Sequence, residues 1–96
     1  MTIANKNDAN KEDVLAALAT LRQALENGPE TAEVARALDQ CGRLEVAIRQ
    51  FHAEGIRFAA FTLLRMVLSH GTDFTEPVQL ATRALNDALE VAGFPH

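Results

Sequence analysis

The spacing of apolar residues predicts a helix near the start of the chain. Between Lys11 and Asn27, apolar positions recur at steps of four and three residues, which is the period of an amphipathic helix. These positions are Val14, Leu18, Leu21 and Leu25, and Leu15 widens the stripe. Asn10 is a suitable residue to cap the first turn, and Gly28 followed by Pro29 ends the helix.

A second apolar stripe runs from Pro29 to Glu54 and passes Gly42 without changing face. Its members are Val34, Leu38, Cys41, Leu44, Ile48 and Phe51. They stay within an arc of about 140°, so the pattern predicts one long helix. A break at Gly42 is the alternative, because glycine costs about 1 kcal/mol relative to alanine inside a helix. We expect the chain to turn at Gly55, with Ile56 packing on Phe51 after a glycine in the left-handed conformation.

The stretch from Ile56 to His70 is the most apolar part of the chain. Two thirds of its residues are apolar, whereas a helix that covers one side of a small core needs only about three in seven. We therefore expect 56–70 to be a central hydrophobic helix and the most buried one. Its polar arc consists of Arg57, Thr62, Arg65 and Ser69, and Phe58 and Phe61 fall inside the same arc.

The last predicted helix begins at Thr75 or Glu76 and ends at Ala92. Its inner positions are Val78, Ala81, Leu85, Ala88, Leu89 and Ala92. Phe74, just before it, is expected to fold under the bundle, and Gly93 and Phe94 form the signature of a helix end. Strand-like alternation is absent, so the predicted fold class is all-α, a bundle of four helices, or five if Gly42 breaks one.

Size and charge narrow the functional classes. The 96 residues suit one domain over 11–96, and the polar, aperiodic segment 1–10 predicts a disordered tail. A net charge of -4 disfavours nucleic acid and anionic lipid as partners. The apolar run is too short, and too interrupted by arginine, to span a membrane. One cysteine and a first segment without an apolar core predict a cytoplasmic protein.

Motifs that carry chemistry are missing. His52 and Glu54 have the H-x-E spacing of zinc deaminases, but the Pro-Cys-x-x-Cys that completes that site is absent. Cys41 and His52 lie about 16 Å apart along one predicted helix, so they cannot form a nucleophile and base. We expect Cys41 to be a buried packing residue and His52 to lie on the apolar stripe. No catalytic residue, metal ligand or cofactor is predicted.

Four residues of the central segment are the candidate interaction site: Arg57, Phe58, Phe61 and Arg65. Each arginine must reach water or meet a carboxylate, for which Glu45, Glu54, Asp87 and Glu90 are candidates. The two phenylalanines need a covering surface, either another helix of this chain or a second subunit.

These residues predict a non-catalytic protein–protein interaction module, formed as a homodimeric helical bundle. One alternative is a helical bundle that binds a small molecule or an anion in a pocket with His52, Arg57 and Arg65. A second alternative is an acidic binding protein of the antitoxin or immunity type. Residues 47–61 are also loosely similar to half of a tetratricopeptide repeat, although the period of about 34 residues is absent.

Overall fold

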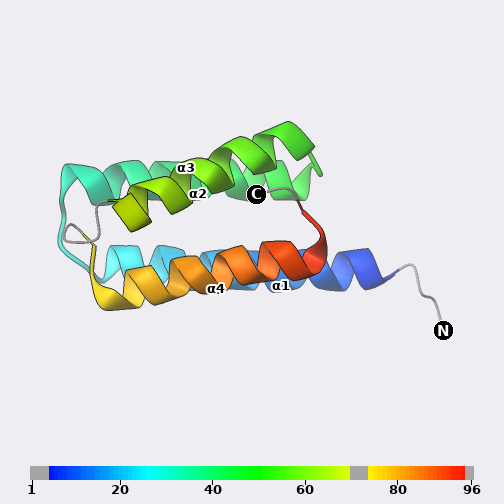
Figure 1. Cartoon of the computed structure of the whole chain (residues 1–96), viewed down its shortest axis with the longest axis horizontal. Helices are drawn as coiled ribbons and strands as arrows, with labels where there is room; N and C mark the ends of the chain where they lie inside the picture. Colours follow the sequence, from blue (N-terminus) through cyan, green and yellow to red (C-terminus); the bar gives the residue numbers. More distant parts are fainter. Residues whose placement is uncertain (1–4, 70–73, 95–96) are drawn as a thin grey trace.

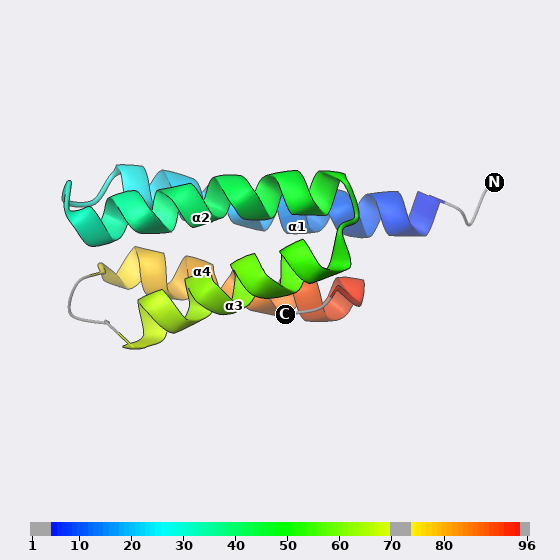
Figure 2. The same cartoon turned by 90° about the horizontal axis from the view of Figure 1, so that it is seen from above.

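The part of the chain that the structure describes forms four antiparallel helices. The computed structural model describes residues 5–69 and 74–94, and for 5–10 the backbone alone. The helices are α1 (Asn5–Glu26), α2 (Ala32–Arg49), α3 (Ala53–Ser69) and α4 (Glu76–Ala92). α1 packs on α2 and α4, and α3 packs on the same two helices (Figures 1 and 2). The described residues contain no strand, so the predicted all-α class is confirmed.

Each helix contributes one stripe of buried side chains to a shared core. The largest fully buried ones are Leu18, Leu21, Leu25, Leu44, Ile48, Ile56, Leu63 and Leu89. Their spacing of three and four residues points each stripe inward on a helix of about 3.6 residues per turn. Phe74, just before the start of α4, is also buried, as predicted.

The first helix begins earlier than predicted. α1 starts at Asn5, so Asn10 lies inside the helix and does not cap it. The early turns of α1 extend beyond the ends of the other helices (Figures 1 and 2). Residues 5–10 are almost entirely polar, so the periodicity of apolar residues gave no sign of these turns. Residues 1–4 lie outside the described part of the chain.

The second helix is shorter than predicted and Gly42 does not break it. α2 begins after Thr31, whose side-chain oxygen accepts a hydrogen bond of 3.1 Å from the backbone N–H of Val34. It ends at Arg49, so the predicted continuation to Glu54 is wrong. The described part of the chain accordingly has four helices, not five.

The turn between α2 and α3 lies at Phe51, four residues before the predicted corner at Gly55. Phe51 adopts a left-handed backbone with φ of 52°, a conformation that usually needs glycine. The N–H groups of Phe51 and His52 donate to the carbonyls of Ile48 and Ala47, which is the Schellman pattern that ends many helices. The Phe51 ring lies 5.9 Å from the ring of Phe94. This contact offsets part of the backbone strain.

His52 caps α3, which corrects the prediction that it lies on the apolar stripe. Its Nδ1 accepts a hydrogen bond of 2.9 Å from the N–H of Gly55, and its side chain is exposed. A Cβ at position 55 would lie 2.7 Å from His52 Nδ1 and 3.1 Å from the Cβ of Ala47. Gly55 is therefore required by a close contact between α3 and α2, not by a corner.

Replacing Gly42 and replacing Gly55 by alanine should have opposite effects on the stability of the fold. Gly42 lies inside α2, and a Cβ at this position would have no neighbouring heavy atom within 4 Å outside its own helical turn. Gly42→Ala should therefore stabilise the fold by about 0.5 to 1 kcal/mol. Gly55→Ala meets Ala47 and weakens the His52 cap, so it should destabilise the fold by about 1 kcal/mol. Urea unfolding followed by circular dichroism measures both. A gain in stability from Gly55→Ala would contradict the close contact.

The prediction of a central, most buried helix at 56–70 is not confirmed. α3 occupies one corner of a ring of four helices, and none of the four lies in the middle (Figures 1 and 2). The buried side of α3 consists of Ile56, Ala59, Ala60, Leu63 and Val67. Its opposite side is exposed. The predicted caps at His70 and Gly71 lie outside the described residues.

The end of α4 agrees with the sequence. Gly93 is left-handed with φ of 78°, and the N–H of Phe94 donates to the carbonyl of Leu89 over 3.0 Å. The Phe94 side chain is partly buried against the core and contacts Phe51. The last turn of α4 and the turn between α2 and α3 are thereby joined at one end of the bundle.

Candidate functional site on the outer face of α3

Large apolar side chains are exposed on the side of α3 that faces away from the core. Phe58 is 69% exposed, Phe61 54% and Leu68 51%. Phe58 and Phe61 are one turn apart, and Leu68 lies seven residues after Phe61, so all three share one face of the helix. We call the set Glu54, Phe58, Phe61, Arg65 and Leu68 the outer stripe of α3.

The outer stripe has the spacing of a helix-pairing seam. Its members follow one another at steps of four, three, four and three residues. This is the a/d spacing of helices that pair with a second helix. The core stripe of α3 already uses the inner side, so the helix has two apolar sides and the bundle covers only one of them.

Both arginines of α3, Arg57 and Arg65, are exposed. Among the described residues, no Asp or Glu lies within ion-pair distance of Arg57 or Arg65, so the predicted partners are not observed. The guanidinium of Arg65 lies 6.0 Å from the centre of the Phe61 ring, at the edge of cation–π distance. The outer face therefore combines exposed rings with cations available to an acidic group.

The arginines of α1 and α2 are paired with carboxylates, whereas Arg83 of α4, like the two of α3, has no ion pair with a described residue. Glu45 binds both Arg22 of α1 and, over 3.1 Å, Arg49 of α2. Arg43 contacts Asp39 over 2.9 Å. The pairs Asp39–Arg43 and Glu45–Arg49 are the ones that a spacing of four residues on a helix predicts.

Two shallow depressions flank the exposed rings. One is lined by Glu54, Arg57, Phe58 and Phe61, and the other by Phe58, Phe61, Thr62, Arg65, Met66 and Ser69. The rings of Phe58 and Phe61 stand between them. A ridge with a hollow on each side is a shape that side chains of a second helix can enter.

The predicted pocket of His52, Arg57 and Arg65 is not assembled. His52 is occupied in capping α3, and Arg57 and Arg65 are exposed and lie about 12 Å apart along the helix. Arg57 and Arg65 belong to different depressions. These three side chains do not converge on one cavity.

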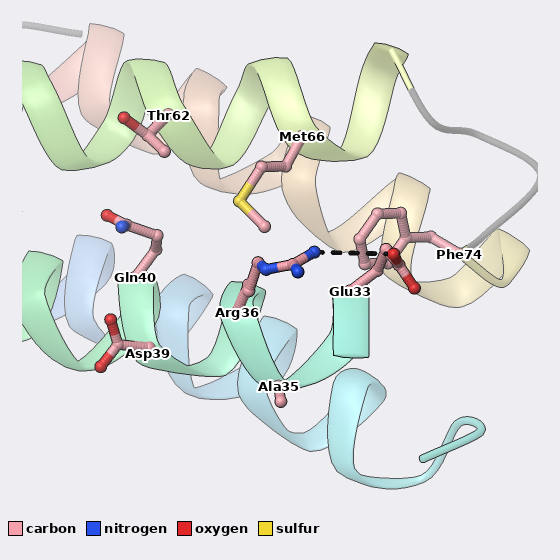
Figure 3. A pocket seen from close by; sticks show the side chains of 8 residues that line it. All are labelled: Glu33, Ala35, Arg36, Asp39, Gln40, Thr62, Met66 and Phe74. Carbon is pink, nitrogen blue, oxygen red and sulfur yellow. Dashed lines mark ion pairs between the residues drawn. The ribbon is translucent and has the colours of Figure 1, made fainter. Parts of the chain in front are cut away.

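A separate groove lies between α2 and α3. Its side chains include Glu33, Arg36 and Gln40 of α2 and Thr62 and Met66 of α3 (Figure 3). Arg36 is paired with Glu33 over 3.6 Å (Figure 3). Within the described residues, the buried Oε1 of Gln40 has no hydrogen-bond partner. The one ring that lines it, Phe74, is buried, so the groove lacks the exposed aromatic surface of the outer stripe.

Cys41 is a packing residue, as predicted. It is fully buried, and this burial raises the pKa of its thiol to about 12, against a small opposing effect of Arg22. A thiol that stays protonated at neutral pH is not a nucleophile. The exposed His52 lies beyond the end of α2 and cannot serve it as a base.

Within the described residues, no three side chains of His, Cys, Asp or Glu are grouped closely enough to hold a metal ion. The helices of residues 5–69 and 74–94 are also all too short or too polar to cross a bilayer. Comparisons with protein-family models, curated proteins and solved structures found no match to this chain.

Two contributors to the outer stripe were missed from the sequence. Leu68 lies outside the predicted polar arc, but it is half exposed. Glu54 was placed at the end of the preceding helix, but it belongs to the first turn of α3. The spacing could have identified both residues, because Glu54 lies four residues before Phe58 and Leu68 lies three residues after Arg65.

Proposed function

We propose that this chain is a protein–protein interaction module without catalytic activity of its own, and that it acts as a homodimer through the outer stripe of α3. The observation that carries the proposal is the exposure of Phe58 and Phe61 on one face of one helix. Burying a phenylalanine side chain that is otherwise exposed is worth about 1.5 to 3 kcal/mol. Two such exposed rings on one face of a helix strongly favour association with a second protein surface.

The polar groups around the rings support a protein partner over a small ligand. The depressions beside Phe58 and Phe61 are shallow and open, whereas small-molecule sites usually enclose most of their ligand. Arginine next to aromatic rings is the composition of energetically important positions at protein interfaces. The remaining exposed apolar residues are spread over other elements: Val46 lies on α2, Phe51 in the turn after it, and Leu80 and Val91 on α4.

We expect Phe61→Glu to weaken dimerisation by about a hundredfold, because it removes a ring and buries a charge in the interface. The matched control is Leu80→Glu, which places the same charge at a 61% exposed apolar position of α4. Analytical ultracentrifugation over a range of protein concentrations measures the dissociation constant of each variant. Circular dichroism checks that both remain helical.

A wild-type protein that stays monomeric at hundreds of micromolar would overturn the homodimer. A dimer that Leu80→Glu disrupts and Phe61→Glu does not would place the interface on α4 and overturn the assignment to α3.

A further inference from the structure

We infer that the occupant of the outer stripe is the outer stripe of a second copy of this chain, with the two α3 helices antiparallel. This inference rests on the proposed function and adds the arrangement of the two subunits. In this arrangement Phe58 of one copy faces Phe61 of the other, and Glu54 faces Arg65. Each contact occurs twice, as two-fold symmetry requires.

The spacing of the first four members of the outer stripe is self-complementary, and Leu68, the fifth member, lies outside this series. From Glu54 to Phe58 is four residues, from Phe58 to Phe61 three, and from Phe61 to Arg65 four. The series reads the same in both directions, with its midpoint between Ala59 and Ala60. A two-fold axis through this midpoint brings each of the four positions onto another of the four, over about 16 Å of helix.

The charges match the same symmetry. The two ends of the series carry opposite charges, Glu54 and Arg65, and the two inner positions are both phenylalanine. The antiparallel arrangement therefore places an acid opposite a base at each end, and two exposed rings opposite each other in the middle. Arg57 faces the neutral Thr62, so no like charges oppose each other.

Other arrangements of the two α3 helices leave some of these residues without a complementary group. In a parallel pair, Glu54 would face Glu54 and Arg65 would face Arg65, which is repulsive. An antiparallel pair shifted by one heptad would place Phe61 against Arg65 and Phe58 against Leu68, and would leave Glu54 without a partner. The unshifted antiparallel pair is the one in which every member from Glu54 to Arg65 has a complementary group.

The shape of the surface agrees with the charges. The depression beside Glu54 and Arg57 and the depression beside Thr62 and Arg65 lie on opposite sides of the ring pair. The proposed axis places Glu54 and Arg57 of one copy opposite Arg65 and Thr62 of the other, so each depression faces the other one of the second copy. The rings of one copy can thus enter the depressions of the other, as side chains do when helices pack.

A charge exchange tests the arrangement. Glu54→Arg alone places arginine opposite Arg65, and Arg65→Glu alone places glutamate opposite Glu54. We expect each variant by itself to dimerise about tenfold to a hundredfold more weakly than wild type. Mixing the two variants should restore a dimer, because both ends are then paired with opposite charges. The double variant Glu54→Arg, Arg65→Glu should also dimerise by itself.

Glu90→Arg and Arg83→Glu on α4 are the matched controls, because they make the same charge changes at exposed positions outside the stripe. They should leave dimerisation unchanged. Sedimentation of each variant, alone and in one-to-one mixtures, gives the dissociation constants, and circular dichroism confirms folding. Loss of affinity in both single variants with recovery in the mixture supports the arrangement.

The result separates this inference from the proposed function. If Phe61→Glu dissociates the dimer but Glu54→Arg has no effect, the interface is on α3 and the antiparallel arrangement is wrong. If mixing the single variants fails to restore the dimer, the facing of Glu54 and Arg65 is wrong. If the wild-type protein does not dimerise, the proposed homodimer and this inference are both overturned.

Discussion

Replacing Leu63 by alanine should lower the free energy of unfolding by about 2 to 5 kcal/mol. Leu63 lies on the inner side of α3 and is fully buried. Truncation removes apolar atoms from the core and leaves a cavity that the surrounding side chains cannot fully close. For a small domain with a total stability of about 5 to 15 kcal/mol, this is a large fraction.

The control for this prediction is Leu68→Ala on the same helix. Leu68 is 51% exposed, so its truncation in the monomer should change stability by less than about 0.5 kcal/mol. Urea unfolding at a protein concentration low enough to keep both variants monomeric measures the difference. Equal losses at the two positions would show that α3 is rotated relative to the core, and the outer stripe would no longer be exposed.

The Cys41 thiol should react with a thiol reagent about a thousandfold more slowly than a free cysteine at pH values near 8. Burial raises its pKa from 9.0 to about 12, so the thiolate fraction falls by that factor. Its complete burial hinders the reagent further. The release of a chromophore from a disulfide reagent, before and after addition of urea, measures the effect.

Because of the same pKa shift, the free energy of unfolding should depend on pH in the alkaline range. Below pH 9.0 the thiol is protonated in both states and its contribution to stability is complete. Between pH 9.0 and about 12 the unfolded chain loses the proton and the folded chain keeps it, so the free energy of unfolding falls by about 1.4 kcal/mol per pH unit. Cys41→Ala is the control, because it should lack this part of the decline. Rapid labelling of Cys41 in the native protein would contradict its burial.

The position of the turns shows where sequence reasoning failed. Gly55 followed an apolar stripe and had an apolar residue after it, which is the usual pattern of a helix end. The chain instead turns at Phe51, in a backbone conformation that local preference disfavours. The reason is tertiary: Phe51 contacts Phe94, and Gly55 is needed where α3 passes close to Ala47.

The candidate site was predicted in part. Phe58 and Phe61 stood out because they fall in the polar arc of an otherwise apolar helix, and the structure leaves both exposed. The expected carboxylate partners of Arg57 and Arg65 are not observed, and one of those candidates, Glu45, pairs with Arg22 and Arg49 instead. Which carboxylate an arginine meets depends on which helices are neighbours. The helical period of the sequence carries no information about which helices are neighbours.

The sequence by itself determined the helical class, the span of α4 and most of the buried positions. These follow from a local property, since apolar residues three and four apart lie on one side of any helix. The tertiary structure decided how much of α3 stays outside the core: the predicted polar arc faces outward, and Leu68, which lies outside that arc, is half exposed with it. That helix is apolar around most of its circumference, so its own sequence is compatible with more than one rotation. Packing of Leu63 and Val67 between α2 and α4 selects one rotation, and it leaves Phe58 and Phe61 facing outward.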